Sequence, residues 1–147
     1  MKNNVLCDDN RLIYFLSATE SGSIHDKAIA DEYPIELPLN SVLRQDLGFL
    51  GHSPKGITIE QPFKKSKHNS LTFSQKLYNR MLSATRVVIE HANSGIKRLR
   101  IIKDIIRIYD SAFRDTVMVL ACALHNFRTI SRAYYSCALA LINILSQ

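Results

Sequence analysis

The sequence predicts a mixed α/β fold in which helices pack on a small β-sheet. Two observations lead to this prediction. Short β-prone apolar runs separated by turn residues fill the first 60 positions, and apolar residues at helical spacing recur from residue 73 onward. A length of 147 residues suits one domain, and 46% hydrophobic with 22% charged residues is ordinary globular usage. The composition therefore excludes disordered and low-complexity chains.

The first 32 residues predict an antiparallel hairpin followed by a short helix. Residues 5–7 and 12–19 are the two β-prone runs, and the DDNR cluster at 8–11 is a turn between them. Ser23 is the expected N-cap of a helix over residues 25–32, which Pro34 and Pro38 end.

Two further strands and a long helix follow. Residues 41–45 predict a strand that stops at the DLG sequence of 46–48, and residues 57–60 alternate apolar and polar before Pro62. After a basic loop at 64–70, Thr72 and Gln75 form a T-x-x-Q capping box, which predicts a helix from residue 73 to about Gly95. Paired isoleucines at 101–108, a helix over 115–128 and a last helix near 132–145 complete the order.

Basic charge is concentrated in one segment. The chain has 19 Lys and Arg against 13 Asp and Glu, a net charge of +6. Residues 1–60 hold 5 basic and 9 acidic side chains, whereas residues 64–107 hold 11 and 2. A strongly basic block favours a polyanionic partner, most simply DNA bound through its phosphates. A solvated basic face is the alternative interpretation.

Membrane and secreted classes do not fit the pattern. The longest uncharged apolar stretches, 117–124 and 133–145, are shorter than the roughly 20 residues of a membrane-spanning helix. Acids at 8 and 9 stand where a signal peptide is apolar, so we expect a cytoplasmic protein with no membrane association. The odd, widely spaced Cys7, Cys122 and Cys137 fit buried thiols in a reducing compartment.

Two carboxylates stand out by position. Asp46 follows a predicted strand and precedes a glycine, at the edge of an α/β sheet where ligands usually gather. Glu90 shares one stripe of the long helix with Arg86 and Lys97. An acid surrounded by bases could hold Mg²⁺ or Mn²⁺ against a phosphate, because hard cations take carboxylate oxygens.

Each of these patterns also has a plainer interpretation. Glu90 with Arg86 fits a surface ion pair worth about 0.3–0.5 kcal/mol, and Asp46 fits a turn-forming aspartate. The Cys122-x-x-His125 spacing resembles half a zinc site, but no second pair stands at ligand spacing. Without a nucleophile motif or a glycine-rich phosphate loop, the residue pattern goes no further than a basic α/β domain with nucleic acid as a candidate partner.

Several short strings follow one another in a recognisable order along residues 2–128. Residues 22–27 read GSIHDK and residues 45–51 read QDLGFLG, while Arg86, Glu90 and Lys97 have the spacing R-x3-E-x6-K. With these, the chain resembles the DDE transposases of bacterial insertion sequences and the related Harbinger-type endonucleases. The corresponding family motifs are G-S-x-H-D, D-x-G-Y-x-G and Y-x2-R-x3-E-x6-K, although Ser83 replaces the tyrosine of the last one. Further matching stretches are 64–65, 71–80, 86–91, 96–98 and 123–126.

The resemblance implies a ribonuclease H-like fold and a metal-dependent reaction on DNA. It makes Asp46 the second acid and Glu90 the third acid of the D-D-E triad, and thus the expected catalytic and metal-binding residues. In such enzymes the triad holds divalent cations, Mg²⁺ or Mn²⁺, for phosphodiester cleavage and strand transfer. His25 and Asp26 are possible accessory residues. The expected DNA-binding residues are Lys64, Lys65, Lys67, Arg86, Lys97 and Arg98.

One part of the family pattern is missing from the sequence. The first acid lies on a strand upstream of the stretch that residues 2–6 resemble, so we expect an N-terminally truncated catalytic domain at 1–130 and a helical tail at 131–147. Such an incomplete ribonuclease H-like fold lacks its first, central strand.

The expected function is that of the C-terminal portion of a transposase, inactive alone, which acts on transposon ends. Its partners besides DNA would be an upstream transposase fragment or further copies of the chain. The alternatives are a non-catalytic DNA-binding fragment that regulates or inhibits a full-length transposase, and a relic without present function.

Overall fold

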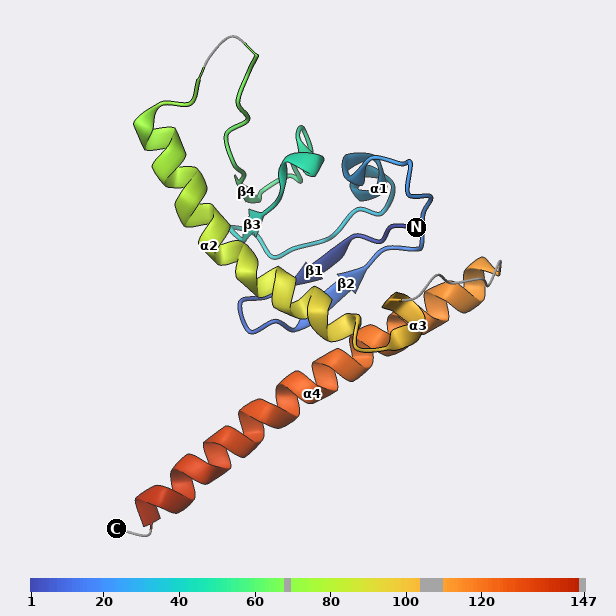
Figure 1. Ribbon diagram of the computed structural model, residues 1–147, viewed down its shortest axis with the longest axis vertical. Coiled ribbons are helices and arrows are strands. Elements are labelled where there is room, and N and C mark those ends of the chain that lie inside the picture. Colours follow the sequence, from blue (N-terminus) through green and yellow to red (C-terminus); the bar gives the residue numbers. More distant parts are fainter. Residues whose placement is uncertain (68–69, 104–109, 146–147) are drawn as a thin grey trace. The chain divides into compact units, whose positions relative to one another are not determined.

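The computed structural model describes residues 1–67, 70–103 and 110–145, and the side chains of 1–67, 70–102 and 110–135 (Figure 1). Strands and helices both occur, which confirms the predicted α/β class. The chain divides into two compact units. The first unit comprises Met1–Val5 and Ser17–Val87, and the second unit comprises Leu6–Leu16 and Val88–Gln147.

The predicted hairpin is present. Strand β1 (Val5–Cys7) pairs with β2 (Ile13–Leu16), and the carboxylate of Asp8 accepts a hydrogen bond from a backbone N–H of the turn at 2.8 Å. Strand β2 ends before the predicted residue 19, because beyond Leu16 the hydroxyl of Ser17 replaces a backbone partner and accepts from the N–H of Asn4 at 2.8 Å.

The first helix, α1 (Asp26–Glu32), is confirmed, but its predicted cap is wrong. The N-cap is His25, whose side chain makes no capping hydrogen bond. Ser23 is taken up in the preceding turn, where its hydroxyl lies 2.9 Å from that of Ser21. Ile29 is almost fully buried, at 1% exposure, and attaches the helix to the first unit.

Strands β3 (Val42–Arg44) and β4 (Thr58–Glu60) form a parallel pair in the register Val42 to Thr58. A 3-10 turn, η1 (Leu47–Phe49), follows β3. The named strands therefore form two separate two-stranded sheets, β1–β2 and β3–β4, and not the single small sheet that the sequence predicted. The reason is that no strand in the described residues joins β1 to β3.

The long helix α2 (Phe73–Ile96) begins where the capping box predicted. Thr72 donates its N–H to the Gln75 side chain at 3.0 Å, and the Gln75 N–H donates to the Thr72 hydroxyl at 3.3 Å. The helix continues one residue beyond Gly95, its expected end. Its buried side chains are Leu82, Ala92 and Ile96.

The C-terminal region is one long helix, not two. Helix α3 (Arg100–Lys103) covers the start of the isoleucine run, of which residues 104–108 lie outside the described residues. Helix α4 (Ser111–Leu145) then runs through residues 129–131, which were expected to separate two helices. These positions hold neither glycine nor proline, and the Thr129 hydroxyl donates to the carbonyl of His125 at 3.0 Å within the helix.

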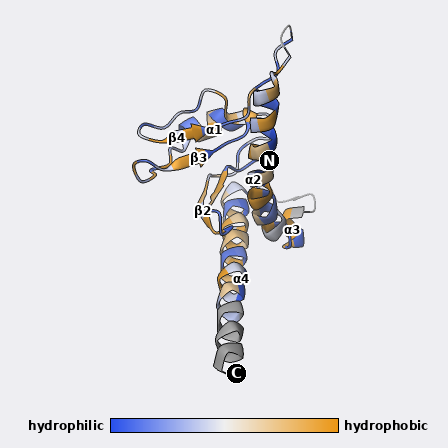
Figure 2. Cartoon of the chain, turned by 90° about the vertical axis from the view of Figure 1, so that its left-hand side faces the viewer, coloured by the Kyte–Doolittle hydropathy of each residue, from blue (hydrophilic) through white to orange (hydrophobic). Residues whose placement is uncertain are grey.

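Hydrophobic and hydrophilic residues alternate around α4 over its described part (Figure 2). None of the helices in the described residues combines the length and apolarity that a membrane crossing requires. Large apolar side chains on α4 are nevertheless exposed, namely Phe113, Val119, Leu120, Phe127, Ile130, Tyr134 and Tyr135.

The second unit is held together where α4 meets the hairpin. The Asn126 side chain accepts from the N–H of Ile13 at 2.8 Å and donates to its carbonyl at 2.8 Å, as a neighbouring strand would. The Nε2–H of His125 donates to the carbonyl of Arg11 at 2.8 Å, because a carbonyl can only accept. The buried residues around these bonds include Ile13, Ala121 and Cys122.

Candidate functional site

In the first unit, the GSIHDK and DLGFLG strings lie against each other. One carboxylate oxygen of Asp26 occupies the space above Gly48, where a Cβ atom would lie only 2.5 Å from it. The other oxygen pairs with the ammonium of Lys2 at 3.1 Å. Any side chain at residue 48 would therefore displace the carboxylate of Asp26 from this position.

A second contact joins α1 to the segment that follows η1. The carboxylate of Asp31 on α1 pairs with Lys27 one turn earlier and with Nδ1 of His52 at 2.9 Å. The hydrogen bond from Lys27, followed by that from His52, lowers the pKa of Asp31. Gly51 has a φ of +86°, which favours glycine, and passes close to the Lys27 stem. Asp26 in the first turn of α1 and Asp31 in its last turn thus both contact the segment 48–52.

Asp46 lies at the junction of β3 and η1 and is exposed to solvent. One carboxylate oxygen accepts from the N–H of Leu47 at 2.6 Å, which makes Asp46 the cap of the 3-10 turn. The other oxygen lies 3.2 Å from Nη2 of Arg86 on α2. Both side chains are about half exposed, at 48% and 46%, so this pair contributes only about 0–1 kcal/mol to stability. Arg86 can therefore be drawn to a phosphate at little cost.

Glu90 follows Arg86 by one turn of α2 and belongs to the second unit. Its exposed side chain lines an open cavity of about 500 Å³ together with Lys97 and Arg98. The expected phosphate-binding cations thus lie beside the expected third acid. Asn93 and Ser94 complete the lining.

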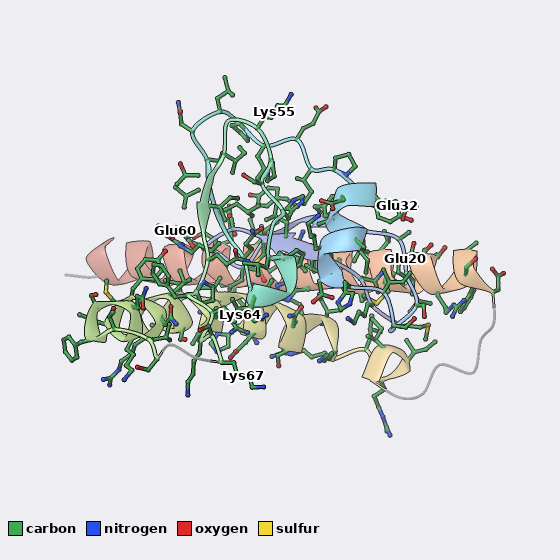
Figure 3. All side chains as sticks on the ribbon, turned by 90° about the horizontal axis from the view of Figure 1, so that it is seen from above. Glu20, Glu32, Lys55, Glu60, Lys64 and Lys67 are labelled. Atoms are coloured by element: carbon green, nitrogen blue, oxygen red, sulfur yellow. The ribbon has the colours of Figure 1, made fainter. Side chains whose placement is uncertain are left out.

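The predicted lysines stand on the segment that links β4 to α2. The backbone of Phe63 is fixed to α2 by Asn79, which accepts from its N–H at 2.8 Å and donates to its carbonyl at 3.0 Å. The Phe63 ring also meets the edge of Tyr78 at 5.4 Å between centroids. Lys64 and Lys67 project from the chain just beyond this anchor (Figure 3). Lys64, Lys65 and Lys67 are all exposed.

A second cavity, which the sequence did not reveal, lies within the second unit. It measures about 520 Å³ and brings together the hairpin turn, the end of α2 and the middle of α4. Only Arg98 among its lining residues was expected to bind DNA. The residues that line it are Asp9, Asn10, Arg11, His91, Ser94, Gly95, Arg98, His125, Arg128, Thr129 and Arg132.

Comparison with known proteins now identifies the family. The model of the DDE superfamily endonucleases matches residues 1–126. The chain belongs to this family. It is also 31% identical over 83 residues to a probable transposase for insertion sequence element IS702 from Microchaete diplosiphon, which is 56% of this chain and 30% of the relative. The chain thus spans less than a third of that relative's length. No solved structure matches the chain.

The DDE superfamily endonucleases generally use divalent metal ions as cofactors. In residues 1–67, 70–103 and 110–145, however, no three His, Cys, Asp or Glu side chains come together as a metal site. Asp26 is bound to Lys2. The Cys122-x-x-His125 pair, for which the sequence offered no second pair of ligands, also has other contacts. His125 bonds to the hairpin turn, and burial raises the pKa of the Cys122 thiol.

Proposed function

We propose that this chain is part of the catalytic domain of a DDE transposase that cleaves and joins DNA at transposon ends, with Asp46 and Glu90 as two of its three acids. The contact between Asp46 and Arg86 carries the proposal, because within the first unit it brings the arginine of the R-x3-E-x6-K pattern to the expected second acid. The cations beside Glu90, Lys97 and Arg98, support it.

The strand pairing supports a ribonuclease H-like fold that lacks its first strand. In that fold the first strand is central, with an antiparallel pair on one side and a parallel pair on the other. Removing it leaves one antiparallel pair and one parallel pair, as β1–β2 and β3–β4 are here. A two-stranded sheet is marginally stable alone, so we propose that polypeptide outside these 147 residues supplies the strand. The catalytic part would then be 1–130 and the tail 131–147.

The donor chemistry fits Mg²⁺ or Mn²⁺. Hard divalent cations prefer carboxylate oxygens, which Asp46 and Glu90 both offer. A carboxylate has about four acceptor positions, and the contacts of Asp46 within the described residues take up two of them, for Leu47 and Arg86. The proposal assigns the first acid of the triad to the same outside strand. When bound, the metal would activate the attacking oxygen and stabilise the leaving oxygen.

The chain's own basic residues would orient the DNA. Arg86 would transfer from Asp46 to the phosphate at the cleavage point and so neutralise charge there. Lys97 and Arg98 would bind the neighbouring phosphate beside Glu90, while the lysines at 64, 65 and 67 would hold the backbone without reading sequence. His25 and Asp26 would act as positioning residues, because Asp26 fixes the turn that carries Asp46.

A plasmid-nicking assay in Mn²⁺ tests the proposal. The chain should not nick DNA alone, and it should nick when combined with the polypeptide encoded immediately upstream. Asp46→Asn and Glu90→Gln should each abolish the restored activity, whereas Arg80→Gln, at an exposed arginine of α2 with no assigned role, should preserve it. Nicking by either acid variant at the parent rate would refute the assignment of that acid.

The basic segment at 64–107 favours a second function, a non-catalytic DNA-binding fragment that inhibits a full-length transposase. This alternative predicts metal-independent DNA binding that both acid variants retain. It also predicts that the chain slows transposition when added to an active transposase, and that no upstream polypeptide confers nicking.

A further inference from the structure

We propose that the second unit contains a further phosphate-binding cleft, which shares Arg98 with the cavity beside Glu90 and is otherwise formed by Arg11, Arg128 and Arg132, and that it binds the backbone of a DNA duplex. The proposal deepens the proposed function by adding a DNA contact outside the acids, and it rests on that function for the identity of the polyanion. The cleft is the cavity of about 520 Å³ between the hairpin turn, the end of α2 and α4.

Charge makes the cleft selective for anions. Its lining has four arginines and two histidines against the single carboxylate of Asp9. Three of the arginines, Arg11, Arg98 and Arg132, are exposed, and Arg128 is half-buried. The ion pairs seen in the described part of the chain leave Arg98, Arg128 and Arg132 uninvolved. Guanidinium groups bind phosphate oxygens in pairs, so such an arrangement suits a phosphodiester.

The backbone of Arg11 is held in a conformation that costs energy. Its φ is +70°, in the left-handed region, where an arginine is less stable by about 1–3 kcal/mol. Two bonds fix it there. Its N–H donates to the carbonyl of Asp8 at 3.0 Å, and its carbonyl accepts from Nε2 of His125 at 2.8 Å. The strained residue is thus an arginine whose carbonyl is hydrogen-bonded to α4, the helix that carries Arg128 and Arg132.

Helix α4 and the turn after α2 bring their arginines to the same place through His125. Arg128 and Arg132 follow it at three and seven residues, on the same face of α4. On α2, Gly95 allows the close approach, because a Cβ there would lie 2.0 Å from Nδ1 of His125. Arg98 follows Gly95 by three residues and lines the same cavity. The cleft is therefore built around one histidine that contacts all three segments.

Fluorescence anisotropy with a labelled 20-base-pair DNA duplex in EDTA tests the proposal on the full chain, between 50 and 200 mM salt. The plot of log affinity against log salt has a negative slope. The double variant Arg128→Gln/Arg132→Gln should make this slope shallower by about 1.8, which is about 0.9 for each lost phosphate contact. The ratio of the parent's affinity to that of this variant should thus fall about 12-fold between 50 and 200 mM salt. Arg128→Lys/Arg132→Lys should restore most of the slope, and Arg80→Gln should leave it unchanged.

Two outcomes would overturn the proposal. One is a slope for the glutamine double variant equal to that of Arg80→Gln, with far-UV circular dichroism showing that both variants are folded. The other is competition by inorganic phosphate or adenosine monophosphate as effective, per phosphate, as the duplex, which would mean a small-anion site. The double variant Asp46→Asn/Glu90→Gln should bind the duplex like the parent. The catalytic proposal is tested separately by the nicking assay, in which unchanged nicking by this variant would refute the catalytic proposal.

Discussion

Removing the side-chain amide of Asn126 should destabilise the second unit strongly. In the structure this amide satisfies both backbone groups of Ile13, each at 2.8 Å, and Ile13 is only 8% exposed. Asn126→Ala would leave a buried N–H and a buried carbonyl without partners. At about 1–3 kcal/mol for each group, the free energy of unfolding should fall by about 2–6 kcal/mol. That is a large part of the roughly 5–15 kcal/mol of a typical domain.

Asn79 provides a matched control, because it forms the same two hydrogen bonds to Phe63, at 2.8 and 3.0 Å. Phe63 is 46% exposed, so water can replace the lost amide. Asn79→Ala should therefore cost about 1 kcal/mol or less. The two substitutions remove the same atoms and the same number of hydrogen bonds, and they differ in burial alone.

The assay is urea unfolding of both variants, combined with hydrogen exchange at the Ile13 amide. We expect a lower midpoint and faster exchange at residue 13 for Asn126→Ala alone. Asn126→Asp should be intermediate, because it keeps the acceptor for the Ile13 N–H but turns an oxygen toward the Ile13 carbonyl. Equal losses for the two alanine variants, or full protection of the Ile13 amide in Asn126→Ala, would refute the reasoning.

Three further predictions concern single contacts. Gly95→Ala should lower the thermal midpoint by the equivalent of about 1–3 kcal/mol, because its Cβ would overlap His125, and the added change His125→Ala should relieve the loss. Lys27→Met should raise the pKa of Asp31 toward its ordinary 3.8, as measured by NMR of its carboxyl carbon. Because the pKa of Asp31 is lower in the folded than in the unfolded chain, its ionisation stabilises the fold above the unfolded pKa, and this stabilisation disappears as pH falls through the folded pKa. Cys122 should react with iodoacetamide at pH 8.5 more slowly than in the unfolded chain, because burial raises its pKa. An equal rate would contradict the buried position.

Local signals in the sequence predicted most of the elements. Thr72 and Gln75 lie three residues apart, and their reciprocal bonds place the start of α2 at the expected residue. The Ser23 cap failed although it is equally local, because the hydroxyl of Ser21 competes for it. The continuous α4 was missed because Thr129 and Ser131 resemble a break while permitting a helix.

Contacts between distant residues could not be predicted from periodicity. Asp46 and Glu90 were chosen from their local settings, but the ion pair of Asp46 with Arg86 spans 40 positions of the sequence. The cluster of Arg11 with Arg128 depends on a hydrogen bond between residues 114 positions apart, and no spacing rule covers such a distance. One local feature of the sequence pointed to these contacts, the family-like stretch at 123–126, which contains His125 and Asn126. The contacts of these two side chains become visible in the fold.

The second unit is built from two segments that lie far apart in the sequence, and this separation has a consequence for synthesis of the chain. Its hairpin is complete by residue 16, but the side chain that pairs with Ile13 is 113 residues further on. At about 5–20 residues per second, a ribosome needs about 6–23 s to reach it. During synthesis the hairpin thus emerges well before the segment that provides its partners. Any product that stops before Asn126 leaves the hairpin without them, and such products should be the preferred targets of chaperones and proteases.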